Sequence, residues 1–177
     1  ALLLDHLPSR VMKGLLALAT QGRIIRNRTV ASLFHYGVAW GFIFYLLVNA
    51  VDVLEGYVPG LRFLGDGVVG GLYRLLADLF SAAVLIGVAF FLIRRFVARA
   101  PELRFRANVL QHPAVAASGV MRDSLIVGVF IFFHVGFRLL GASFHVAESP
   151  DAWQPVAGLI SRLWTGLAPI ALEAGRH

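Results

Sequence analysis

The sequence contains no cysteine among its 177 residues. Disulfide bonds and thiolate-bound iron–sulfur clusters are therefore excluded within this chain. Charged residues are also scarce, at 15% of the chain, whereas soluble domains carry about a quarter. Hydrophobic residues reach 58%, which leaves too few polar groups to cover the surface of a soluble protein. The composition predicts an all-α integral membrane protein.

Several chemical signatures are missing as well. The sequence has no glycine-rich phosphate loop, no Ser/His/Asp ordering and no cluster of histidines and carboxylates with metal-ligand spacing. Nothing in it therefore supports hydrolysis or phosphoryl transfer. The formal net charge is +6, but the basic residues flank apolar runs, where they act as topology signals. We expect a lipid bilayer, and no nucleic acid, as the partner of this charge.

Four apolar segments approach the roughly 20 residues that a spanning helix needs. They cover residues 31–54, 72–93, 123–146 and 153–172. The last is the weakest, because Pro155, Arg162 and Pro169 interrupt it, so it is either shorter or partly interfacial. We predict a bundle of about four transmembrane helices over residues 31–177.

The distribution of Lys and Arg predicts the orientation of the spans. The basic residues gather before the first span and between the second and third: Arg10, Lys13, Arg23, Arg26 and Arg28, then Arg94, Arg95, Arg99, Arg104, Arg106 and Arg122. Because loops rich in Lys and Arg stay in the cytoplasm, these two segments should be cytoplasmic. The 55–71 and 147–152 loops should face outward, and the expected location is a bacterial cytoplasmic (inner) membrane.

The N-terminal segment 1–30 precedes the bundle. Within it, Val11–Arg28 is apolar on one side and basic on the other, which predicts an amphipathic interfacial helix. The alternative is the tail of an earlier span. The chain begins with Ala1 rather than Met and ends just after an apolar run, so we expect it to be part of a longer polypeptide.

The third span carries three polar residues, His134, Arg138 and His145. At 3.6 residues per turn they fall within about 40° of one another on one helix face, and Gly141 shares their stripe. Polar groups inside a bilayer are costly and call for partners. A neutral imidazole is a good axial ligand for haem iron, and an arginine can pair with a haem propionate. The stripe therefore suggests haem b, with His134 as one axial ligand.

A second candidate face lies on the first span. His35 stands near its cytoplasmic end, and Ala39, Phe42, Leu46 and Asn49 continue that face. His35 or His145 would serve the same haem or a second one, although His35 lies shallower than His134. The alternative is that these histidines bond neighbouring helices, water or headgroups. Tyr36 and Trp40 could line a quinone pocket, but aromatic residues also form interface belts.

Arg74 and Asp78 stand four residues apart at the outer end of the second span. This spacing predicts an intrahelical ion pair, and the alternative is a proton or quinone role for Asp78.

The first span also carries a family resemblance. The stretch RNRTVASLFHYGVAWGFIFYLLVNAVDVLEG, followed by GGLYRLLADLFSAAVLIGVAFFLIRRFVARAPELRFR and RDSLIVGVFIFFHVGFRLLGASFHVA, resembles the membrane domain of iron–sulfur oxidoreductases related to heterodisulfide reductase. That domain is similar to the cytochrome b (gamma) subunit of respiratory nitrate reductase. The resemblance implies that His35 ligates haem and that electrons pass between a cytoplasmic iron–sulfur or flavoprotein partner and menaquinone. The further His-bearing span and the Cys-rich domain of the family are absent from this sequence.

Together these features predict a haem b-binding, quinone-interacting membrane subunit of a respiratory or photosynthetic electron-transfer complex. The 94–122 loop would dock an acidic partner or serve only as a retention signal. The competing hypothesis is a non-redox scaffold that contacts lipid and other membrane subunits. A transporter is less favoured, because the sequence shows neither inverted repeats nor paired broken helices.

Overall fold

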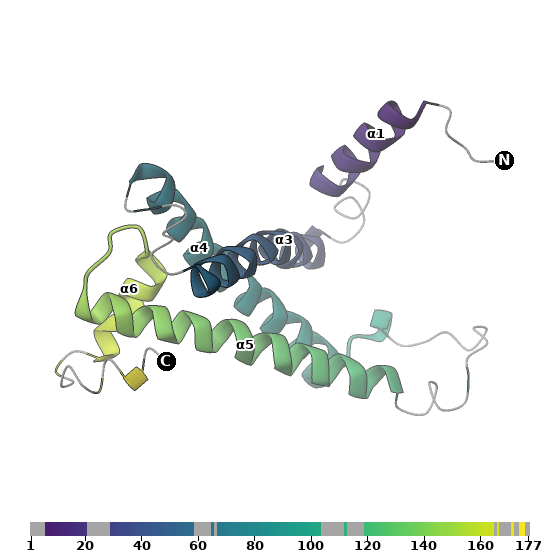
Figure 1. Ribbon diagram of the computed structural model, residues 1–177. Helices are drawn as coiled ribbons and strands as arrows, with labels where there is room; N and C mark the ends of the chain where they lie inside the picture. The colour runs from purple at the N-terminus through teal and green to yellow at the C-terminus, as the bar shows by residue number, and fades with distance from the viewer. Residues whose placement is uncertain are drawn as a thin grey trace. The chain divides into compact units, whose positions relative to one another are not determined.

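The computed structural model describes residues 6–20, 29–58, 65, 67–103, 112, 119–164, 166, 171 and 174–175. All regular structure in these ranges is helical, and they contain no strand. The chain divides into two units, Ala1–Tyr36 and Gly37–His177. Figure 1 shows the helices of both, and each unit is described by itself.

The first unit contains helix α1, which spans Leu7–Thr20. The Ser9 hydroxyl donates a hydrogen bond to the His6 carbonyl at the start of the helix, with 2.9 Å between the oxygens. Leu7, Val11 and Leu15 are about half exposed. The helix covers part of the predicted 11–28 segment, and residues 21–28 lie outside the described ranges. Its interfacial position stays a prediction.

Three helices are long and apolar enough to cross a membrane, and they indicate a multi-pass membrane protein. They span Thr29–Tyr57 (α3), Val68–Leu92 (α4) with its continuation η1 over Ile93–Val97, and Val120–Glu148 (α5). At 1.5 Å per residue, 29 residues extend about 44 Å, which exceeds a hydrocarbon core of about 30 Å. The first three predicted spans are confirmed as membrane-length helices.

Glycines allow α3 to approach α4 closely. A Cβ at Gly41 would overlap the Val84 side chain and lie 3.5 Å from the Phe80 carbonyl oxygen. A Cβ at Gly37, one turn earlier, would make an ordinary 3.6 Å contact with Ala83. Helices in membranes associate through such small residues because lipid provides no hydrophobic force between them. The Gly-x-x-x-Gly spacing thus determines which face of α3 meets α4.

The core between α3, α4 and α5 is small. Tyr45, Val84, Val88 and Val135 form its buried centre. The Tyr45 hydroxyl donates to Ser81 Oγ at 2.6 Å, and Ser81 donates in turn to the Ala77 carbonyl. Even this phenol is therefore satisfied inside the bundle, as a low-dielectric interior requires.

The fourth predicted span is not confirmed. Helix α6 covers only Pro155–Ser161, and one 3-10 turn, η4 (Arg162–Trp164), follows. Together they rise about 16 Å, half the thickness of the hydrocarbon. Beyond Trp164 only Gly166, residue 171 and residues 174–175 are described.

The two C-terminal elements pack back onto α5 (Figure 1). Trp164 stacks on Phe144 with 4.3 Å between ring centroids, and its Nε1 donates to Ser143 Oγ at 2.8 Å. Leu139, Val146 and Ala157 form a second buried cluster there.

The loops between the long helices are described only in part. Helix α4 begins at Val68, within the segment 55–71 that the sequence assigned to a loop, and a Cβ at Gly71 would lie 2.6 Å from Trp153 Cδ2. In the described part of the arginine-rich loop, the 3-10 turn η2 spans Pro101–Leu103. Most of the remaining loop lies outside the described residues.

Candidate functional site

His134 lines an apolar groove between α3 and α5. The groove has a volume of about 290 Å³. Its lining comprises Phe42, Tyr45, Leu46, Asn49, Val84, Phe130, Ile131, His134 and Val135. Phe130 stacks on the imidazole, with 5.8 Å between ring centroids and 9° between ring planes. The structure therefore brings Phe42, Leu46 and Asn49, three members of the predicted α3 face, to the imidazole of His134.

The polar stripe on α5 runs along the edge of a helix interface. His134, Arg138 and His145 each immediately precede a buried residue, Val135, Leu139 and Val146 respectively. One residue corresponds to about 100° around a helix, so the polar stripe flanks the buried one. His134 itself is exposed on the surface of the bundle. Gly141 does not line the groove.

Arg138 has a protein partner. Its guanidinium forms a two-pronged ion pair with the Asp52 carboxylate of α3 and lies 5.9 Å from the centroid of the Tyr45 ring. Such forked arginine–carboxylate pairs are among the stronger ionic contacts in proteins. A haem propionate is therefore not needed to explain Arg138, and its partner Asp52 was not among the residues predicted from the sequence.

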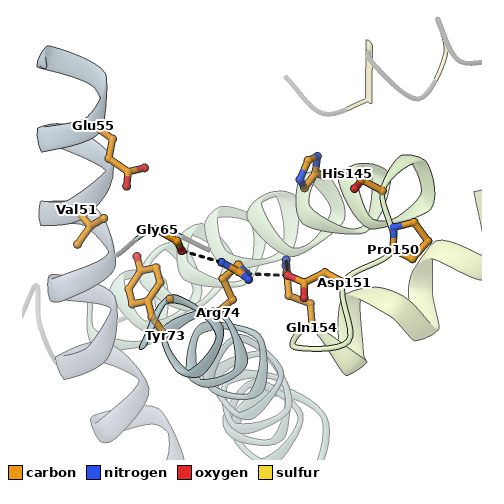
Figure 2. A pocket seen from close by; sticks show the side chains of 11 residues that line it. Val51, Glu55, Gly65, Tyr73, Arg74, His145, Pro150, Asp151 and Gln154 are labelled. Atoms are coloured by element: carbon orange, nitrogen blue, oxygen red, sulfur yellow. Dashed lines mark hydrogen bonds and ion pairs between the residues drawn. The ribbon is translucent and has the colours of Figure 1, made fainter. Parts of the chain in front are cut away.

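His145 faces a different cavity from His134 (Figure 2). This cavity has a volume of about 540 Å³ and lies where α3, α4 and α5 approach the segment before α6. It is lined by Val51, Glu55, Gly65, Gly70, Tyr73, Arg74, His145, Ser149, Pro150, Asp151 and Gln154. The hydroxyl oxygen of Tyr73 is buried and has no hydrogen-bond partner among the described residues. The two histidines of α5 thus belong to separate sites.

Arg74 and Asp151 form the ionic centre of this second cavity. Arg74 Nε donates to Asp151 Oδ2 at 2.7 Å, and Asp151 also accepts bonds from the Trp153 backbone N–H and the Gln154 amide. Partial burial raises the pKa of the Asp151 carboxyl, but the bonds from Gln154, Trp153 and Arg74 outweigh it, so its pKa lies below the ordinary value. The carboxylate is held ionised at neutral pH.

The predicted intrahelical pair of Arg74 with Asp78 is wrong, because each side chain has a long-range partner instead. Asp78 is 4% exposed and accepts the backbone N–H groups of Val156 at 2.6 Å and Ala157 at 2.9 Å. These are the second and third residues of α6, whose N–H groups have no acceptor within the helix. Asp78 therefore caps α6 from α4, with its negative charge at the positive end of the helix dipole. This contact accounts for a buried carboxylate without a proton or quinone role.

The remaining candidates lie on α3. His35 is exposed and Tyr36 half-buried, and both belong to the first unit, whereas the half-buried Trp40 belongs to the second. His112 is exposed in the arginine-rich loop. Among the residues that the structure describes, no group of three or more His, Asp or Glu side chains could hold a metal ion.

Two signals in the sequence could have predicted the close packing of α3 on α4 and the Arg138–Asp52 ion pair. Gly37 and Gly41 stand four apart within an apolar run, which is the spacing of close helix packing. Asp52 and Arg138 carry the charges nearest the centre of their respective spans, so mutual pairing was the simplest way to neutralise both. Asp151 and Gln154 gave no such signal.

Comparison with protein-family models, with curated proteins and with solved structures finds no match to this chain. The resemblance of its spans to the iron–sulfur oxidoreductases therefore stays a hypothesis from the sequence.

Proposed function

We propose that the chain is a haem b-binding, quinone-interacting membrane subunit of an electron-transfer complex in a bacterial cytoplasmic membrane. The observation that carries the proposal is the exposed imidazole of His134, which opens into the apolar α3–α5 groove. Within the described residues this imidazole makes a ring contact with Phe130 and no hydrogen bond. An imidazole at the hydrocarbon-facing surface is costly unless a further group covers it.

The chemistry of the groove fits a haem. Apart from Asn49, the described side chains that line it with His134 are aliphatic or aromatic, and His134 would supply a nitrogen ligand. Its volume of about 290 Å³ is near the lower limit of ligand sites, which run from about 300 to 1,000 Å³. Phe42, Leu46 and Phe130 are exposed, so the groove opens onto the bundle surface and does not confine a ligand to that volume. The haem would supply one-electron chemistry, and the chain would supply the ligand and a low-dielectric wall.

The quinone part of the proposal has two candidate locations. Tyr36 and Trp40 are the candidates from the sequence. The 540 Å³ cavity adds Tyr73 and His145, whose O–H and N–H groups suit the carbonyl oxygens of a quinone. A cytoplasmic iron–sulfur or flavoprotein partner would be the electron donor.

A pyridine haemochrome spectrum of the purified full chain tests the haem directly. We expect a haem b band that is lost in His134→Ala and retained in His145→Ala, a matched change on the same helix. A chain that purifies folded without haem overturns the proposal, and an unchanged band in His134→Ala removes His134 as the ligand. His35→Ala tests the ligand that the family resemblance implies, and helical circular dichroism confirms that each variant is folded.

Quinone binding is tested by titrating a menaquinone analogue and following tryptophan fluorescence. Tyr73→Phe should weaken binding if the 540 Å³ cavity is the site, whereas Tyr57→Phe, at a residue 85% exposed, should not. Weakened binding in Tyr36→Phe alone would instead place the quinone at the sequence candidate.

A non-redox scaffold is the second candidate, and the surface of α5 favours it. Only 11% of the most apolar window of α5 is buried, against 28% for α4, so most of this helix is available to lipid or to another subunit. The Arg138–Asp52 pair, itself partly exposed, needs no cofactor. Absence of haem together with stable association of the chain in a larger membrane complex would support this role.

A further inference from the structure

The arginine-rich end of α4 contains a small cavity that the proposed function does not use. Here the α-helix changes into the π turn η1, in which the Ala98 N–H donates to the Ile93 carbonyl at 2.9 Å. The backbone then leaves the helix at Arg99, whose φ of 48° lies in the left-handed region. The residues at the end of this helix line a cavity of about 160 Å³, together with a residue of α5. Its lining comprises Arg95, Arg99, Ala100, Leu103 and Met121.

The charges at this cavity are unbalanced. Arg94 is directed to Glu102, with 3.4 Å between guanidinium nitrogen and carboxylate oxygen. Arg95 instead donates to the Met121 sulfur at 3.4 Å, and a thioether is a weak, uncharged acceptor. Arg99 forms no ion pair or hydrogen bond with any residue in the described ranges. Two guanidinium groups therefore line a cavity to which no described residue contributes a carboxylate.

The surroundings of the cavity are apolar. Ile93, Val97 and Met121 are 57%, 76% and 43% exposed at the ends of α4 and α5, and Ala100 and Leu103 line the cavity beside the two arginines. Positive charge thus meets an apolar helix surface at the end of a membrane-length helix. Basic pockets in this position, on the cytoplasmic side, bind lipid headgroups, and guanidinium groups match phosphate oxygens in geometry and charge.

We propose that Arg95 and Arg99 bind the phosphate headgroup of an anionic phospholipid at the arginine-rich end of α4. The phosphate balances both charges, while the acyl chains lie along the exposed side chains of Ile93 and Val97. An acidic protein surface would satisfy the charges but would leave those apolar side chains without a matching partner. The combination of charge and apolar surface favours lipid.

Native mass spectrometry of the purified full chain tests this proposal with phosphatidylglycerol as the probe and phosphatidylcholine as the neutral control. A surface arginine contributes roughly a fivefold gain in affinity for anionic lipid. Arg95→Gln and Arg99→Gln should each lower the preference for phosphatidylglycerol about fivefold, and the double variant should abolish it. Arg94→Gln is the matched control, because it removes the same charge from a residue that Glu102 already balances.

Three outcomes would overturn the proposal. These are an absence of preference for phosphatidylglycerol, an equal loss in Arg94→Gln, and displacement of the lipid by polyglutamate or inorganic phosphate at matched charge. The last result would mean that an acidic protein or a free anion is the ligand. Arg95→Lys/Arg99→Lys keeps both charges and should retain binding, which separates a lost site from a misfolded chain. Haem content is not part of this readout, so the two proposals fail independently.

Discussion

The region around α6 and the α3–α5 groove differ in whether their polar groups have hydrogen-bond partners. Around α6, Asp78 accepts two backbone N–H groups and Arg74 pairs with Asp151. In the groove, the imidazole of His134 makes no hydrogen bond with a described residue. Buried polar groups are normally satisfied within the protein. The polar groups of the first region are thus satisfied within the protein, whereas the exposed imidazole of His134 remains open to its surroundings.

Replacing Asp78 should lower the stability of the region around α6 more than any other substitution considered. Asp78→Ala leaves two N–H groups of α6 without an acceptor in a buried place, which should cost about 3 kcal/mol of unfolding free energy. Denaturant titration in detergent measures the loss. Asp78→Asn retains one carbonyl oxygen and should lose less. Wild-type stability in Asp78→Ala would show that the cap is not needed.

Gly41→Ala tests whether the groove depends on close packing of α3 against α4. The new methyl group would overlap the side chain of Val84, which is fully buried and short. We expect a loss of about 2 kcal/mol and, if haem binds in the groove, a reduced haem band. Gly37→Ala is the matched control, because its Cβ makes only an ordinary contact with Ala83. Equal effects of the two substitutions would contradict the packing described here.

Acid should loosen the region around α6 through Asp151. The pKa of this carboxyl is depressed in the folded state, so its contribution is complete above the ordinary aspartate value of about 3.9. That contribution is lost as the pH falls through the lower folded value. The stability of the wild type should fall by about 1 kcal/mol relative to Asp151→Asn. Denaturant titrations from neutral pH to about pH 3 test this, and parallel curves would contradict it.

Tyr45→Phe should have the smallest effect. It removes the bond to Ser81, but the Ser81 hydroxyl still donates to the Ala77 carbonyl, so no donor is left unsatisfied. We expect a loss of about 0.5 kcal/mol. Thermal unfolding followed by circular dichroism measures it. A much larger loss would mean that the phenol also holds Arg138, which lies over its ring.

Features that depend on local sequence were predictable, whereas contacts between distant residues were not. Three spans were predicted correctly, because a membrane-length run of apolar residues is a local property. The face containing Phe42 and Leu46 followed from helical periodicity, and the structure shows that both residues line the groove that His134 also lines.

The polar contacts near α6 could not be predicted in the same way. The four-residue spacing of Arg74 and Asp78 favoured a local pair, but their partners lie 77 and 78 residues away. Such distant pairing follows from tertiary packing, which one sequence does not encode in any local pattern. The cap at the start of α6 was not predictable for the same reason, since it is a carboxylate from α4.

The cap on α6 has a consequence for the order of synthesis. The carboxylate that starts this helix is translated 78 residues before the N–H group it receives. The acceptor for the first N–H groups of α6 is therefore synthesised well before α6 itself, on the earlier helix α4. A chain lacking α4 would keep the contacts of this segment with α5 but would lose the carboxylate that caps α6. Docking of α6 can thus be followed as protection of Trp153 and Trp164 from added quencher.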